Sequence, residues 1–256
     1  MAAPSEMSFW DHLDVLRSCI IRVLVVLAVV LVGCFFALPH VFDTIILGPT
    51  HADFFVYRWL GFAYGPAEDV EIINIAVASQ FLTHISTAFW MSLVLVFPYL
   101  MYQIWAFVKP ALYPRELRGV RTAFGGGTIL FYLGCAVGYL VVFPIIFRFL
   151  VQYRIGGEVL NQINLGSYMS LFLSMVFIMG LVFEMPILAW MLGVLGVLNK
   201  EMLKSWRRYA VVVLLVLAAA ITPTGDPFTL FVVFLPLYLL YELSILIVRK
   251  RPSDNE

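Results

Sequence analysis

Charged residues are scarce in this sequence. Only 12% of its 256 residues are charged and 62% are hydrophobic, whereas soluble domains have about 25% charged and about 45–50% apolar residues. The 16 basic and 16 acidic side chains cancel, so no overall field attracts nucleic acid, and we expect no nucleic-acid partner. This composition excludes an ordinary soluble domain and predicts a polytopic membrane protein.

Cysteines, metal-ligand clusters and catalytic motifs are few or absent. The three cysteines, Cys19, Cys34 and Cys135, lie in apolar runs without ligand spacing to the four histidines, so we expect small core residues and no metal site. No Gly-rich phosphate loop, His-Glu-x-x-His or Gly-x-Ser-x-Gly motif occurs. Asp226 follows a glycine as in one half of an intramembrane aspartyl protease, but such an enzyme needs a second facing acid. Because no other Asp falls within a predicted span, we expect no enzyme and no cofactor.

Long apolar runs are abundant, and they predict an all-α fold with six transmembrane helices in a single membrane domain, 1–256. A long outside loop, 39–80, follows the first span. The first 14 residues carry three acids and no lysine or arginine, so we expect the first run to be a retained span and not a cleaved signal peptide. The predicted spans are about 18–38, 81–102, 122–150, 168–195, 209–222 and 228–248.

The last two predicted spans are short. The 14 residues 209–222 would extend about 21 Å, less than the ~30 Å hydrocarbon core, and the sixth span is only marginally long enough. Pro223-Thr224-Gly225-Asp226-Pro227 predicts a turn between them. We expect a short membrane hairpin that thins the bilayer or seats partner helices. The alternative, a soluble-type core hairpin, fits poorly with the basic segments on both sides.

Basic residues predict the orientation. Of the 16 lysines and arginines, only Arg58, Arg148 and Arg154 fall on one side of the predicted spans, and all others fall on the opposite side. By the positive-inside rule, both termini are therefore cytoplasmic, which requires an even number of spans. No internal repeat of the kind found in many transporters is visible.

Glu184 is the only charged residue between Tyr168 and Leu198. An acid within a membrane span usually faces a cavity, a partner or a proton path. Alone, it would fit a proton-coupled secondary transporter that uses Glu184. The other interpretation is a protonated or locally hydrogen-bonded carboxyl packed between helices.

Two segments on the basic side could carry recognition chemistry. The first, His12-Leu13-Asp14-Val15-Leu16-Arg17, is weak alone, because an acid and a base at a helix start are commonly a solvated cap. The second, 103–118, mixes aromatics and prolines with Glu116 among basic residues. A carboxylate beside aromatic rings can bind a guanidinium in two-point geometry. Glu116 could equally neutralise Arg115 or Arg118.

The order of these stretches resembles TatC, the multispanning core subunit of the twin-arginine protein translocase. The resemblance covers about Phe9 to Val248, and its ordered set of motifs is more specific than any one of them. The matching pieces are His12 to Arg17, Phe97-Pro98 to Arg118, Phe131-Tyr132-Leu133-Gly134 through Tyr139 to Phe143-Pro144, Gly180 to Pro186, Thr222-Pro223 with Asp226, and Pro236 with Tyr241-Glu242.

The resemblance implies a six-span, cup-shaped protein of the cytoplasmic (inner) membrane with a concave face open within the bilayer. It implies a receptor for signal peptides that carry two adjacent arginines. The family exports folded proteins with the proton-motive force and without bound nucleotide. Its expected partners are TatA- and TatB-type single-span subunits at spans five and six, within an oligomeric complex in the lipid bilayer.

The resemblance also implies site residues. The arginine-recognition site corresponds to Glu116, Phe107 and Arg17, with Leu112 and Tyr113 in the same loop. The concave-face acid corresponds to Glu184, and the outside loops carry Pro49 and Asp226.

The sequence departs from the family pattern at Val15, where an acid usually precedes the Leu-Arg pair. Asp14 is rotated by about 100° from that position on a helix, and Asp11 lies four residues earlier on the same face. We predict that Asp11 or Asp14 supplies the second carboxylate. Two smaller departures are Gln80, where a proline often precedes the second span, and Leu230, which replaces a polar residue of some relatives.

Overall fold

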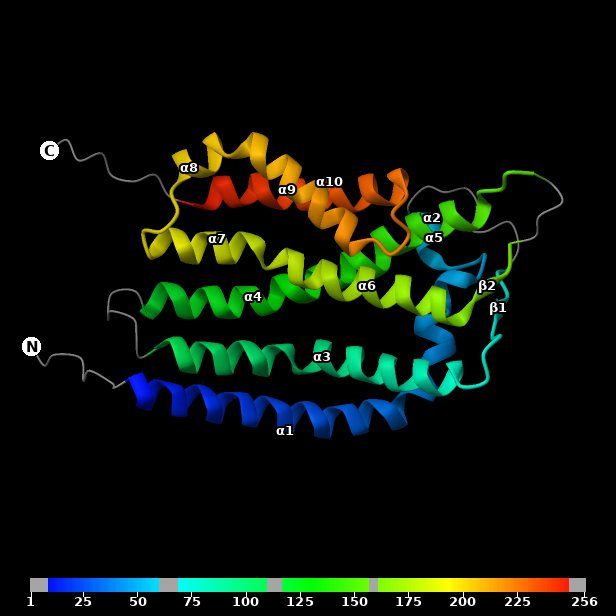
Figure 1. Cartoon of the computed structure of the whole chain (residues 1–256), viewed down its shortest axis with the longest axis horizontal. Coiled ribbons are helices and arrows are strands. Elements are labelled where there is room, and N and C mark those ends of the chain that lie inside the picture. Colours follow the sequence, from blue (N-terminus) through cyan, green and yellow to red (C-terminus); the bar gives the residue numbers. More distant parts are fainter. Residues whose placement is uncertain (1–8, 60–68, 110–116, 157–160, 249–256) are drawn as a thin grey trace, which may run out of the picture.

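The computed structural model describes residues 9–59, 69–109, 117–156 and 161–248, with residues 9–12 and 117–122 described by their backbone alone. Long helices lie side by side along one axis, and α1 begins and α10 ends at the same end of the molecule, here called the terminal end (Figure 1). The principal helices are α1 (Phe9–Val41), α3 (Ser79–Val108), α4 (Leu117–Val137), α6 (Leu165–Phe183), α7 (Met185–Val194), α9 (Arg207–Ile221) and α10 (Pro227–Ile247).

Shorter elements form the connections between the long helices and the far end of the molecule, opposite the terminal end. A two-residue parallel pairing joins β1 (Ile72–Ile73) to β2 (Ile163–Asn164). The remaining elements are a π-helical turn (Phe42–Ile46), a 3-10 turn (Gly48–Thr50), α2 (Phe55–Trp59), a second π-helical turn (Gly138–Val142), α5 (Phe143–Gln152) and α8 (Lys200–Ser205).

The expected all-α polytopic membrane fold is confirmed. Five stretches of the described residues are long and apolar enough to cross a membrane: Leu13–Trp59, Ser79–Val108, Ala123–Gln152, Leu165–Val194 and Pro227–Ile247. Helix α9 has 15 residues, about 22 Å, whereas the 21 residues of α10 reach about 31 Å, close to the hydrocarbon thickness. Of the two helices in the last hairpin, only α9 is therefore clearly shorter than the hydrocarbon core. Figure 1 shows that the hairpin turn does not reach as far as the ends of α3 and α6.

Helix α3 continues beyond the predicted span of 81–102. It runs to Val108 with Lys109 as its C-cap, because no proline or glycine occurs between Tyr102 and Pro110, and the residue before a proline is itself disfavoured in a helix. Gln103 and Phe107 consequently lie on the last turns of a helix, whereas the sequence placed them in a loop.

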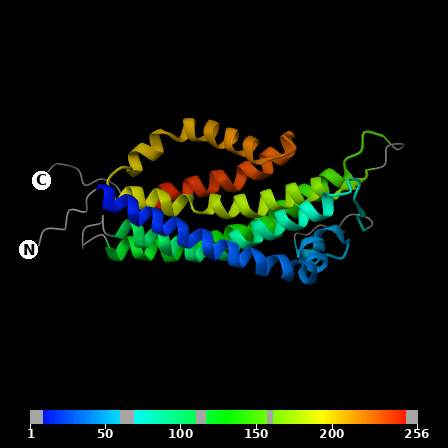
Figure 2. The same ribbon diagram turned by 60° about the horizontal axis from the view of Figure 1, so that its bottom comes forward.

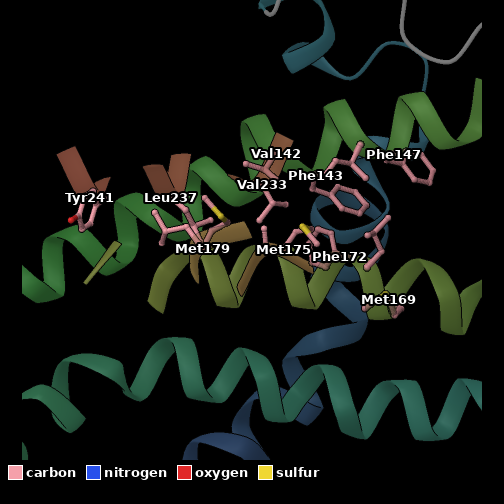
Figure 3. Close-up of a cluster of buried hydrophobic side chains, with 14 of the residues drawn as sticks. Val142, Phe143, Phe147, Met169, Phe172, Met175, Met179, Val233, Leu237 and Tyr241 are labelled. Atoms are coloured by element: carbon pink, nitrogen blue, oxygen red, sulfur yellow. The ribbon is translucent and has the colours of Figure 1, made fainter. Parts of the chain in front are cut away.

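A buried core joins α5, α6 and α10. The Phe143 ring packs edge to face against Tyr168 and Phe172. Figure 3 shows Met175 and Met179 of α6 beside Val233 and Leu237 of α10. Such a continuous apolar cluster fixes the rotation of each helix about its axis.

Helices α4 and α6 approach closely through glycines. A Cβ on Gly134 would lie 2.5 Å from the Met179 carbonyl oxygen, and one on Gly180 would lie 2.7 Å from Cys135 Sγ. Gly134 and Gly138 form a Gly-x-x-x-Gly pair, the spacing that lets membrane helices pack backbone to backbone. This contact is the tightest part of the bundle.

Helix α9 lies at the edge of the bundle. It packs mainly on α10, and Figure 2 shows it arching away from the rest of the bundle. Tyr209, Val212, Val213 and Val216 on it are all exposed. At the terminal end, Arg207 Nη2 donates to Glu242 Oε2 at 2.7 Å, and this ion pair holds the hairpin closed.

Candidate functional site

The terminal end brings together part of the predicted recognition site. Asp14 and Arg17 are exposed near the start of α1, which packs along α3. Phe107, half-buried on the last turn of α3, lines an apolar cavity between the two helices together with Leu16 and Ile20. The end of α3 and the start of α4 lie at this same end (Figure 1).

Several predicted site residues cannot be placed. Glu116, Leu112 and Tyr113 lie outside the described residues, in 110–116. Asp11 lies on the first turn of α1, where only the backbone is described. Among the described residues, the predicted recognition site is represented by the side chains of Asp14, Arg17 and Phe107.

Glu184 marks a break between α6 and α7. Pro186 has no N–H to bond to the Val182 carbonyl, and its ring would clash with that carbonyl in a regular helix, so it favours the break seen here. Glu184 is the C-cap of α6, where its N–H bonds to the carbonyls of Leu181 and Val182, and α7 begins with Pro186 in its first turn.

The Glu184 carboxyl points into the bundle against α4. Glu184 is 6% exposed, and a Cβ built on Gly127 would lie only 2.7 Å from its Oε2. The missing side chain of Gly127 therefore makes the space that the carboxyl occupies. Neither carboxyl oxygen has a hydrogen-bond partner within the described part of the chain. A buried carboxyl without a hydrogen-bond partner destabilises the fold. An acid kept at such a place within a membrane span usually has a function.

Asp226 is the N-cap of α10. Its Oδ1 accepts from the Thr229 N–H at 2.8 Å, and its Oδ2 accepts from the hydroxyls of Thr229 at 2.5 Å and Thr224 at 2.7 Å. Burial alone would raise the pKa of Asp226, but these hydrogen bonds outweigh it and hold the pKa below its ordinary value. The preceding Gly225 has φ +62°, a conformation that favours glycine. The structure thus assigns Asp226 a helix-capping role.

Asp226→Ala is expected to lower the free energy of unfolding by about 1 kcal/mol, because the first turn of α10 loses its cap. Asp226→Asn retains an acceptor and should lose less. Since the folded pKa lies below 3.8, the carboxylate's contribution is complete above about pH 4 and disappears as the pH falls through the folded pKa. Thermal melts followed by circular dichroism at pH 7 and pH 3 measure this. The wild-type advantage over Asp226→Asn should be smaller at the lower pH, and exposed Asp53→Ala serves as the control.

Pro49 is buried in the 3-10 turn at the far end. Its carbonyl accepts from the Tyr57 hydroxyl at 2.6 Å, and the hydroxyls of Tyr139 and Tyr168 donate to the neighbouring Ile45 and Ile46 carbonyls. Three tyrosines from separate helices thus anchor one turn. Sequence reasoning missed these tyrosines, because nothing in their spacing links them to residues 45–49.

Gly127 was also missed as a site residue, although its place on α4 could have been read from the sequence. It lies seven residues before Gly134 on the same helix face, in line with the Gly-x-x-x-Gly pair. A glycine on a helix face that packs against a helix with a buried acid indicates that room is left for the acid side chain.

Comparisons with known proteins agree with one another. The family model described as "Sec-independent protein translocase protein (TatC)" matches residues 11–236. Proteins named Sec-independent protein translocase protein TatC from Blattabacterium sp. subsp. Periplaneta americana and Deinococcus radiodurans are each 34% identical to this chain. They align over 95% and 96% of it, and over 95% and 88% of their own lengths. A crystal structure of the twin arginine translocase receptor TatC superposes with a TM-score of 0.75 at 29% identity, covering 92% of this chain and 97% of that one.

Proposed function

This chain belongs to the TatC family of Sec-independent protein translocase proteins, and on that premise we propose that it is the receptor and core subunit of a twin-arginine translocase. It binds twin-arginine signal peptides at the terminal end, which faces the cytoplasm. With TatA- and TatB-type partners in the inner membrane, it exports folded proteins using the proton-motive force. Family membership favours this function over the proton-coupled transporter that Glu184 alone suggested.

One observation carries the proposal. The start of α1, which carries Asp14 and Arg17, lies at the same end of the molecule as the end of α3, which carries Phe107, and the start of α4, which follows Glu116 in the chain (Figure 1). Two guanidinium groups need carboxylates for two-point hydrogen bonds and aromatic faces for stacking. This end can supply both, and it is the side with the excess of lysine and arginine expected of a cytoplasmic face.

The α9–α10 hairpin is the proposed seat of the single-span partners. Helix α9 exposes a row of apolar side chains and packs mainly on α10. A single-span partner helix would cover this row. Because α9 is only about 22 Å long, the bilayer beside it would be thinned, which would ease the passage of folded cargo.

Glu116→Gln is expected to weaken binding of a twin-arginine signal peptide by about 10- to 100-fold, the loss that follows from a charged hydrogen bond worth about 1.5–3 kcal/mol. Fluorescence anisotropy of a labelled peptide on the purified protein measures it. Glu201→Gln, which removes an exposed acid of α8, is the matched control.

The second carboxylate is tested in the same way with Asp11→Ala, Asp14→Ala and the double variant. At least the double variant should lose about tenfold in affinity. Wild-type affinity in all three would exclude both acids from the site, and wild-type affinity in Glu116→Gln would refute the proposed recognition site.

A further inference from the structure

We propose that the apolar cavity between α1 and α3 receives the first apolar side chains that follow the arginine pair of the signal peptide. This inference rests on the proposed function. The cavity has a volume of about 180 Å³, and its lining includes Leu16, Cys19, Ile20, Val23, Ile104 and Phe107.

The cavity lies toward the start of α1 and the end of α3. Farther along the pair, the His84 ring stacks on Phe35 at 4.0 Å between ring centroids, and its Nε2 lies 2.7 Å from the Phe35 carbonyl oxygen. Near the terminal end, Leu16, Ile20 and Ile104 line the cavity while remaining substantially exposed. An apolar surface between two helices is therefore left open there.

The chemistry of the lining selects an apolar occupant. Among the residues that the structure describes, none that lines the cavity is charged, and the one amide, Gln103, is buried and donates to the Tyr99 hydroxyl at 2.6 Å. A guanidinium placed here would lose its water without gaining an acceptor. An aliphatic or aromatic side chain instead gains the hydrophobic free energy of burial.

Continuity with the arginine site identifies the occupant. Leu16 is adjacent to Arg17, and Phe107 belongs to both the cavity and the recognition site. A signal peptide places its apolar segment directly after its positively charged segment. With the arginines near Asp14 and Arg17, the following residues point along α1 toward the membrane. There the cavity lining extends from Leu16 to Leu24, about 12 Å of helix.

Cys19 provides a native reporter for the test. It is partly exposed, whereas Cys34 and Cys135 are 3% and 8% exposed, so a maleimide should modify Cys19 first. We would follow alkylation of the full-length protein by mass spectrometry, in detergent and in lipid nanodiscs. A saturating twin-arginine peptide should slow modification of Cys19 about tenfold. A peptide with serine at the first three apolar positions after the arginines should protect much less.

A filled cavity gives the second arm. Val23→Phe should weaken the normal peptide about tenfold and leave the serine-substituted peptide unchanged, whereas Val29→Phe, at an exposed position of α1, should change neither. Peptide binding without protection of Cys19 overturns the inference but leaves the proposed function intact. Protection of Cys19 in nanodiscs without peptide, unaltered by peptide, identifies a lipid chain as the occupant and also overturns it. Absence of any twin-arginine binding refutes the proposed function together with the inference.

Discussion

Gly134→Ala is expected to disrupt the packing of α4 on α6 and to lower the free energy of unfolding by about 3 kcal/mol. The added Cβ would lie 2.5 Å from the Met179 carbonyl oxygen, 2.8 Å from Phe183 Cβ and 2.9 Å from Gly180 Cα. Two of these atoms belong to the backbone, so the clash is relieved only by moving a helix. Overpacking a tight core destabilises by about 1–3 kcal/mol and occasionally more, and this contact is at the upper end.

The apparent melting temperature in detergent, followed by size-exclusion chromatography of heated samples, measures this loss. Gly125→Ala is the matched control, because it lies on the same helix with nothing within 4 Å of the added Cβ. That variant should be neutral or slightly stabilised, since alanine favours helix over glycine. Equal melting of the two variants would show that the helix contact tolerates a side chain.

Glu184→Met is expected to raise the free energy of unfolding by about 1–3 kcal/mol while abolishing export. Methionine has a similar volume and removes a buried carboxyl that lacks a hydrogen-bond partner within the described residues, which relieves its desolvation penalty. Where an acid serves a function, replacing it by an apolar residue is expected to make the protein more stable. Melting of the purified protein and export of a folded twin-arginine reporter in cells measure the two effects.

A double-mutant cycle tests the geometry of this site. Gly127→Ala places a Cβ 2.7 Å from Glu184 Oε2 and should destabilise the wild-type protein. It should be tolerated better in a Glu184→Ala background, where the obstructing carboxyl is gone. Additive effects would mean that Gly127 and Glu184 are not in contact. A Glu184→Met protein that melts lower and exports normally would reverse the assigned role of the acid.

Composition and local order in the chain were enough to establish the membrane class and the order of the apolar helices. Hydropathy is a property of consecutive residues, so a run of apolar side chains specifies a membrane helix whatever it packs against. Pro186 acts on its own backbone and that of Val182, so its effect is also local. The ordered motifs likewise sufficed to identify the TatC family.

Helix ends were less accessible to this reasoning. Gln103 and Phe107 were assigned to a loop because polar and basic residues begin there, yet α3 continues to Val108. Polarity marks where a helix leaves the bilayer, whereas backbone geometry decides where it ends.

Tertiary packing alone decided which groups face one another. The Glu184 carboxyl faces Gly127, 57 positions earlier, and the Tyr168 hydroxyl reaches the carbonyl of Ile46. The cavity beside Phe107 exists because α1 and α3 leave a gap at one end. Each of these depends on how helices are rotated and spaced, which is set by side-chain packing over the whole bundle and not by the hydropathy of any one segment.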